Sequence, residues 1–344
     1  MSFHSIKGHQ RQIRVLTNAL KGKTVAHAYL FTGIPGIGKM TVARSLAKAL
    51  NCTVSREDCC DACTSCTMIS RGTHPDIQVI GPEGDHIKIT QIRAMQEQLL
   101  YTRFYGTYRL VLLDGAHTMN IQSANCLLKT IEEPPPHTVI VLSTALPYQI
   151  PATIRSRCQR IAFQPLSPRL IEVALQESLG SENNAACRLA STLASGSLGK
   201  ALRWIETDVL TRRQGLLALI ARPHPPDLTA IIDYADELGE DREALIELLD
   251  FVRLWLRDLM IAKETGMADE LINIDLIDET LAAAARLNWS YLFRNVELIS
   301  EVQSALKGAV NPRIALERML LTATAAPVYT PLPNPHNHRT AFTM

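Results

Sequence analysis

The amino-acid sequence predicts an α/β domain built on a doubly wound parallel sheet, followed by a region made only of helices. Two observations predict the sheet. Apolar runs alternate with amphipathic helical patterns up to about residue 165, and a glycine-rich loop joins the first run to the next helix. A third observation predicts the helical region, because no strand pattern occurs after Ser167. The chain of 344 residues is long enough for two or three domains.

The elements of the α/β part are expected in a regular order. Apolar residues at helical spacing predict an opening helix over 8–21. Continuous apolar runs predict strands over 28–31, 77–80, 110–113 and 139–142. Helical spacing predicts helices between them over 41–50, 90–100 and 121–132. Runs that are apolar throughout are typical of parallel strands buried on both faces, so right-handed crossovers should place helices on both sides of the sheet.

The rest of the chain predicts helices. Apolar residues recur at helical spacing over 168–180, 184–194, 198–206, 226–238, 241–263, 278–286 and 289–307. Asn311 and Pro312 form an N-cap and first-turn pair that starts a last helix. Near the end prolines replace core residues, which predicts a flexible tail over 326–344.

Charge and hydropathy exclude several function classes. Lys and Arg number 35 against 34 Asp and Glu, so the formal net charge of +1 argues against a protein that coats nucleic acid or an anionic membrane by bulk charge. No apolar stretch reaches the roughly 18 residues that a membrane span needs, and the first residues lack the apolar core of a signal peptide. We therefore expect a soluble, cytoplasmic protein whose cysteines are thiols or metal ligands.

The glycine-rich loop has the spacing of a phosphate-binding loop. Its backbone N–H groups can cradle phosphates while Lys39 reaches the β and γ oxygens. The next position normally holds a Ser or Thr that ligates Mg²⁺, but here it is Met40, a poor ligand for a hard cation. Thr41 stands one residue late, which rotates its hydroxyl by about 100° on a helix. An occupied loop and a vestigial one both remain open. The candidate nucleotide-binding residues of the loop are Gly33, Gly36, Gly38, Lys39 and Thr41.

Asp114 ends a predicted strand where phosphate-loop enzymes hold their metal through a carboxylate. A Glu often follows and polarises the attacking water, but here Gly115 follows and cannot accept a proton. Met40 and Gly115 thus predict the same behaviour, with ATP and Mg²⁺ bound weakly or not at all and little or no hydrolysis. The alternative is that Asp114 only caps the next turn.

Cysteines crowd into one polar segment. Two overlapping C-x2-C steps and one upstream cysteine have the spacing of a tetrahedral four-thiolate zinc site, which leaves no open position and is therefore structural. The candidate ligands are Cys52, Cys60, Cys63 and Cys66. Cys59 is an alternative to Cys60. The isolated cysteines, which we expect to be buried thiols, are Cys126, Cys158 and Cys187.

Arg157 lies in a Ser-Arg-Cys triplet at 156–158. An arginine here can stabilise transferring phosphate on a neighbouring subunit, as an arginine finger does. Taken alone, such a residue is more often simply solvated.

Together these segments resemble the bacterial clamp-loader subunits of DNA polymerase III, which are AAA+ proteins. The resemblance extends from about residue 5 to 322, and segment 124–135 with the Ser-Arg-Cys triplet is its most specific part. It also rests on 27–31, the phosphate loop, the four-cysteine insertion and 311–317.

Within that family the sequence is similar to the delta-prime branch. The motor branch (gamma/tau) has an intact phosphate loop, a Glu after the metal-binding Asp and an arginine in its second sensor. The residues at those three positions here are Met40, Gly115 and Gly199. Segments 73–76 and 87–93 are also similar to the delta-prime pattern, and the resemblance places Thr144 near the first sensor.

The resemblance implies a three-part body. Its parts are an AAA+ core over 1–165 with a zinc module at 52–66, a helical lid over 166–208 and a helical collar over 209–325 that oligomerises. It also implies a hetero-oligomer with delta and gamma/tau subunits, part of the DNA-directed DNA polymerase holoenzyme, that loads the sliding clamp onto primed DNA. In that role Arg157 completes a neighbour's ATP site in trans, while this chain's own site is impaired.

Two other hypotheses remain open. The chain could itself be a gamma/tau-like ATPase, with Lys39 and Asp114 sufficient and Thr41 substituting for the missing hydroxyl. It could instead be a zinc-dependent nucleic-acid adapter. The balanced charge weighs against the adapter, because phosphate contacts need several Lys or Arg.

Overall fold

The computed structural model describes residues 2–55, 57–180, 184–207, 209–221, 227–238, 241–306, 308 and 310–324. The chain divides into two compact units, Met1–Ser181 with Ala194–Lys200 and Glu182–Leu193 with Ala201–Met344. The predicted tail over 326–344 lies outside the described residues. Within the described part of the chain, no helix has the length and apolar character that a membrane crossing requires.

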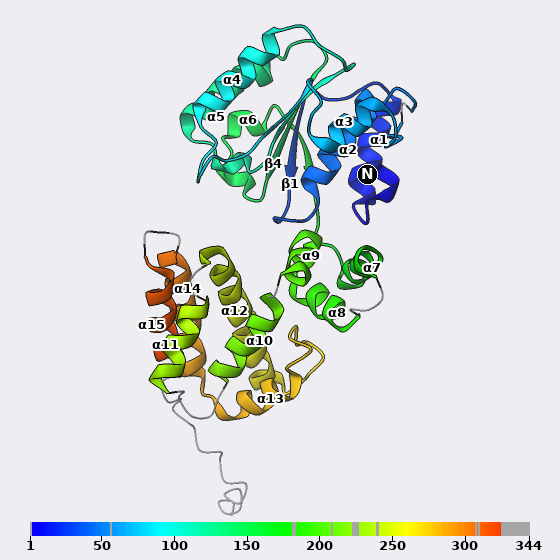
Figure 1. Ribbon diagram of the computed structural model, residues 1–344. Helices are drawn as coiled ribbons and strands as arrows, with labels where there is room; N and C mark the ends of the chain where they lie inside the picture. Colours follow the sequence, from blue (N-terminus) through cyan, green and yellow to red (C-terminus); the bar gives the residue numbers. More distant parts are fainter. Residues whose placement is uncertain are drawn as a thin grey trace, which may run out of the picture. The chain divides into compact units, whose positions relative to one another are not determined.

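A five-stranded parallel sheet forms the centre of the first unit (Figure 1). Its strands are β1 (Ala28–Thr32), β2 (Ile77–Ile80), β3 (Arg109–Leu113), β4 (Thr138–Thr144) and β5 (Gln159–Ala162). They lie in the order β2-β3-β4-β1-β5, with Leu30 of β1 opposite Leu142 of β4. The three inner strands are nearly continuous apolar runs because both of their faces are covered.

Helices cover both faces of this sheet, which confirms the doubly wound fold (Figure 1). One face packs against α1 (Gln10–Lys21), α2 (Lys39–Asn51) and α3 (Thr64–Arg71). The other packs against α4 (Ile89–Leu100), α5 (Ile121–Glu132) and α6 (Ala152–Arg155). Leu46 and Phe31 belong to the apolar cluster on the first face, and Leu127 and Leu142 belong to a separate cluster on the second. The first unit also contains α7 (Pro168–Leu179) and three short 3₁₀ turns, Phe3–Ser5, Ala116–Thr118 and Pro147–Gln149.

The parallel order has a direct consequence for function. The carboxyl ends of β1, β3 and β4 meet at one edge of the sheet, which therefore collects the glycine loop, Asp114 and Thr144. The amino ends of β2 and β3 lie at the opposite edge of the sheet. The segment that enters β2 contains His74, and the segment that enters β3 begins at Tyr101.

The second unit is helical, as the sequence predicts. Its helices are α8 (Asn184–Leu193), α10 (Val209–Ile220), α11 (Leu228–Leu238), α12 (Arg242–Thr265), α13 (Ile277–Arg286), α14 (Trp289–Leu306) and α15 (Pro312–Thr324). The long α12 packs against α10, α13 and α14, and α15 packs against α11 and α14. Helix α9 (Leu198–Glu206) includes the boundary between the two units.

The sequence analysis missed β5, α3 and α10, as well as the short helix α6 and the 3₁₀ turns. Strand β5 is an edge strand with exposed Gln159 and Arg160, so it lacks an apolar run. Helix α3 is short and lies within the cysteine-rich segment, which the sequence analysis interpreted only as a set of metal ligands. Helix α10 buries Arg213 among its apolar residues, which removes the amphipathic pattern; this arginine donates to Asn273 Oδ1 and pairs with Asp275 at 2.7 Å.

Candidate nucleotide pocket, cysteine cluster and exposed arginine

The side chain of Lys39 hydrogen-bonds to the backbone of the glycine loop that precedes it. This residue begins α2, and its Nζ donates to the carbonyl oxygens of Gly33 and Ile34, both at 2.8 Å. The Gly33 N–H in turn donates to the Thr144 carbonyl at 3.2 Å, which ties the loop to the end of β4. Burial lowers the pKa of Lys39, and the nearby Asp114 carboxylate partly offsets that shift. An anion entering the loop would therefore exchange two carbonyl partners of Lys39 for phosphate oxygens.

A cavity of about 500 Å³ lies beside the loop. It brings together most of the predicted nucleotide-binding residues, namely Gly36, Gly38, Lys39, Thr41, Asp114 and Thr144. Gly33 is not among the residues that line it. Met40 and Gly115 do line it, so the two positions that lack a metal-handling group face the same space as Asp114. The pocket therefore has a buried lysine and one carboxylate, but no hydroxyl directly after that lysine.

His117 is a pocket residue that the sequence analysis missed. Its Nδ1 lies 3.3 Å from Thr144 Oγ1, and that oxygen already accepts the Leu146 N–H at 3.0 Å. The His117 ring and the Thr144 hydroxyl are therefore within hydrogen-bond distance of each other. Burial and the Lys39 charge lower the pKa of His117, and Asp114 opposes them, so the ring is neutral at pH 7. Its place three residues after Asp114 was visible in the sequence, but its contact with Thr144 was not.

The start of α9 packs directly on the glycine loop. The Gly199 N–H donates to the Gly36 carbonyl and Ser197 Oγ donates to the Pro35 carbonyl, each at 2.8 Å. A Cβ on Gly199 would lie 2.8 Å from the Gly36 oxygen, and a Cβ on Gly36 would lie 2.5 Å from Ser197 Oγ. Glycine is therefore needed at both positions for the two backbones to touch. Gly199 is therefore a packing contact between α9 and the glycine loop.

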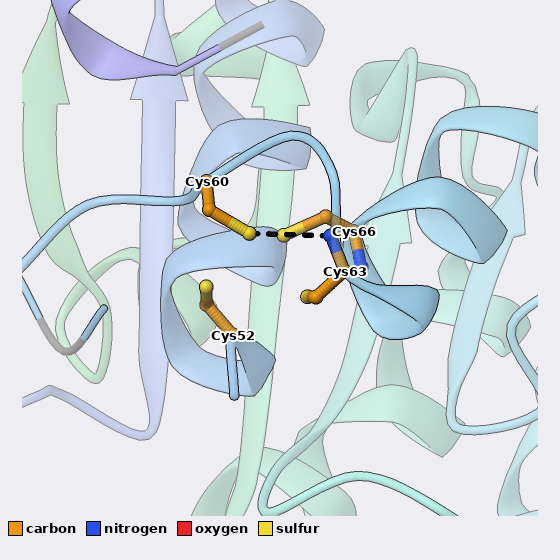
Figure 2. A group of neighbouring side chains, drawn as sticks. All are labelled: Cys52, Cys60, Cys63 and Cys66. Carbon is orange, nitrogen blue, oxygen red and sulfur yellow. Dashed lines mark hydrogen bonds between the residues drawn. The ribbon is translucent and has the colours of Figure 1, made fainter. Parts of the chain in front are cut away.

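The four predicted ligand cysteines form one cluster (Figure 2). Their Sγ atoms all lie within 4.8 Å of one another. Cys52 follows the end of α2, Cys63 caps the start of α3, and Cys66 lies in its first turn. A four-thiolate zinc site has Zn–S bonds of about 2.3 Å and hence sulfur atoms roughly 4 Å apart. The donor set and its spacing fit a tetrahedral metal ion with no position left for substrate.

Backbone N–H groups point at these sulfur atoms. Ser55 N donates to Cys52 Sγ at 3.3 Å, and Cys63 N donates to Cys60 Sγ at 3.2 Å. Burial raises the pKa of the Cys63 thiol, but hydrogen bonds led by the Cys66 N–H outweigh it and lower that pKa to about 6. Burial and the Cys63 side chain raise the pKa of Cys66. Donors aimed at sulfur stabilise thiolates, which is the form that binds metal.

Cys59 is not part of the cluster, so the structure favours Cys60 as the fourth ligand. The Cys59 side chain is buried, and its Sγ lies 3.6 Å from Asp61 Oδ1. Burial and the carboxylates of Asp61 and Asp58 raise the pKa of Cys59 to about 12. A thiol held in its neutral form is a poor metal ligand.

Arg157 lies just beyond α6 and is not among the residues that line the cavity. Its Nη2 is 2.8 Å from Glu132 Oε1, and its Nη1 donates to the Thr153 carbonyl at 3.0 Å. The side chains of Arg157 and Glu132 are 42% and 41% exposed. The guanidinium is thus available at the surface of the first unit.

Two family models match the chain. One, described as "DNA polymerase III, delta subunit", matches residues 8–167, and the other, described as its C-terminal part, matches residues 210–324. The chain is similar to DNA polymerase III subunit delta' of Bacillus subtilis, with 30% identity over 90% of this chain and 94% of that relative. It is also similar to subunit tau of the same organism, with 27% identity over 92% of this chain, and spans 60% of the length of tau. Among solved structures it is similar to a gamma subunit-related protein of DNA polymerase III from Thermotoga maritima, with a TM-score of 0.47, 17% identity, and coverage of 91% of this chain and 98% of that one.

Proposed function

Because the chain belongs to the DNA polymerase III delta/delta-prime clamp-loader subunit family, we propose that it completes a neighbour's ATP site without hydrolysing ATP itself. Its partners in this proposal are the delta and gamma/tau subunits, in a cytoplasmic hetero-oligomer that loads the sliding clamp onto primed DNA. The proposed parts are the core (1–165), the lid (166–208) and the collar (209–325).

The chemistry of the pocket supports a site in this chain that does not hydrolyse ATP. Met40 supplies no hydroxyl for Mg²⁺, and Gly115 supplies no carboxylate to polarise water. Gly199 supplies no cation and packs against the Gly36 backbone instead. Phosphoryl transfer depends on metal and charge placed around the γ-phosphate, so a site without these groups should turn over ATP slowly or not at all.

The main support for the role in trans is the exposure of the Arg157 side chain. Both members of its ion pair with Glu132 are well exposed, and such pairs contribute at most about 1 kcal/mol. A neighbour's triphosphate therefore provides a stronger partner than Glu132, since a guanidinium binds phosphate through two parallel hydrogen bonds.

The test is ATP turnover by the reconstituted assembly with Arg157→Ala in this chain. An arginine finger contributes about 10³-fold or more to turnover at the site that it completes. We expect DNA-stimulated turnover to fall while the variant still assembles. Arg160→Ala is the control, because Arg160 is also an exposed arginine and lies on the adjacent strand β5. Unchanged turnover with Arg157→Ala rules out the role in trans.

A catalytically active, gamma/tau-like chain is the alternative. It is favoured by one observation, that Lys39, Thr41 and Asp114 line the same cavity. In that case the purified chain alone hydrolyses ATP, and Lys39→Ala abolishes the activity. An isolated chain without turnover removes this alternative and leaves the first proposal in place.

We also propose that the cysteine cluster binds one structural Zn²⁺. When bound, the ion supplies a cross-link between the end of α2 and the start of α3, since its four thiolates leave no site for reaction. Metal analysis of the purified chain should give one equivalent of zinc, and a chain purified with zinc in the medium that contains none contradicts this assignment.

A further inference from the structure

The cysteine cluster and an exposed loop at the far edge of the sheet are joined by a continuous set of buried polar contacts. The loop covers residues 101–108 and is called here the aromatic loop. It leads from α4 into β3, and most of its side chains face solvent, with Tyr101 69%, Phe104 82% and Tyr105 55% exposed. Apolar packing therefore does little to hold this loop, and its shape depends on backbone hydrogen bonds.

Asp76 supplies those hydrogen bonds. Its carboxylate accepts the N–H groups of Phe104, Tyr105 and Gly106 at 2.9, 2.8 and 2.7 Å. The side chain is buried, with 5% exposure, so these bonds are protected from water. Burial alone would raise the pKa of Asp76, but the three N–H donors outweigh it and lower that pKa.

His74 links Asp76 to helix α3. Its Nδ1 accepts the Asp76 N–H at 3.2 Å, so its proton lies on Nε2. That Nε2 is 3.1 Å from Ser65 Oγ, to which it donates. Ser65 and His74 are 1% and 3% exposed, and Ser65 lies in α3 directly before the ligand Cys66.

Asn51 makes a second link from the other side of the cluster. It is the last residue of α2 and directly precedes the ligand Cys52. Its Oδ1 accepts the Tyr108 N–H at 2.9 Å, and a Cβ on Gly106 would lie 2.5 Å from the same oxygen. Each of the two links therefore begins at a residue next to a cysteine ligand, on the two helices that a bound metal would join.

We propose that metal binding at Cys52, Cys60, Cys63 and Cys66 sets the conformation of the aromatic loop through Ser65, His74 and Asp76. The metal fixes the start of α3 against the end of α2. This fixes Ser65 relative to Asn51, and the two anchors hold the loop between them. The module thereby has a role beyond its own folding, since it presents the exposed aromatic side chains in one arrangement. The inference rests on the proposed metal.

The test is amide hydrogen exchange of the full chain, measured with Zn²⁺ bound and after chelation. Chelation should speed exchange at 104–108 and in α3, and leave β4 and α5 unchanged. Restoring Zn²⁺ should restore protection. Unchanged exchange in the loop overturns the inference. An equal acceleration throughout the first unit also overturns it, because the metal then stabilises the whole unit and not the loop in particular. Metal content measured on the same samples separates these outcomes from a failure to bind zinc.

Ser65→Ala tests the link itself. The variant keeps all four thiolates, so zinc content should stay at wild-type level while exchange at 104–106 quickens about fivefold, the equivalent of one lost hydrogen bond. Ser70→Ala is the matched control, because Ser70 Oγ donates to the Cys66 carbonyl on the same helix. The same exchange rates in both variants contradict a route through Ser65.

Discussion

Cys59 and Cys60 are adjacent thiols in opposite environments. Cys60 Sγ belongs to the cluster and accepts a backbone N–H, whereas Cys59 is buried beside Asp61 and has its pKa raised to about 12. We predict that Cys60→Ser loses zinc, because the fourth thiolate is gone, while Cys59→Ser keeps one equivalent. Metal content per chain, measured after dialysis against a weak chelator, decides the matter. The opposite pattern would assign Cys59 as the ligand.

Asp76 should make the aromatic loop sensitive to acid. Its folded-state pKa is lowered, so its contribution to stability is fully present above the ordinary value of about 3.9 and is lost as the pH falls through the lowered value. We predict that Asp76→Asn lowers the free energy of unfolding by about 2 kcal/mol at pH 7, because hydrogen bonds to a charged acceptor are lost. Urea unfolding at pH 7 and at the lowest pH where the wild type stays folded checks the sign. The penalty must shrink at low pH, and an equal penalty at both contradicts the assignment.

At the scale of elements, the contact between α9 and the glycine loop leaves no room for a side chain at Gly199. We predict that Gly199→Arg destabilises the chain by about 1–3 kcal/mol, the usual range for overpacking, because any Cβ there meets the Gly36 carbonyl at 2.8 Å. Gly81→Ala is the control, since no atom lies within 4 Å of a Cβ at that position. Thermal unfolding of both variants measures the difference. Equal melting temperatures would show that α9 and the loop separate without cost.

The sequence predicted the elements whose pattern matches their burial. Strands β1, β3 and β4 are covered on both faces and therefore appear as apolar runs. Strand β5 lies at an edge, and α10 buries Arg213 on the side that carries its apolar residues, so neither shows the expected pattern. Cysteine spacing likewise identified the cluster, but the choice between Cys59 and Cys60 depends on burial and neighbouring charge, which spacing does not encode.

At the scale of the whole molecule, the features that the sequence did not predict are contacts between residues far apart in the chain. Ser197 meets Pro35, Thr144 meets His117, and Asp76 meets the aromatic loop. The first two contacts lie at the carboxyl ends of the strands, and the third lies at their amino ends. The carboxyl edge of the sheet carries the glycine loop, with Met40 and Gly115 in its cavity, and the opposite edge carries the aromatic loop, which Asp76 holds by three hydrogen bonds.

In the proposed function, this chain's own glycine loop does not hydrolyse ATP, whereas the assembly depends on its Arg157. The most direct measurement is DNA-stimulated ATP turnover by the reconstituted assembly carrying Lys39→Ala in this chain alone. Since Lys39 lines this chain's own cavity, we predict turnover equal to wild type, in contrast to the loss with Arg157→Ala. A drop in turnover with Lys39→Ala, in an assembly of normal subunit composition, would contradict the account.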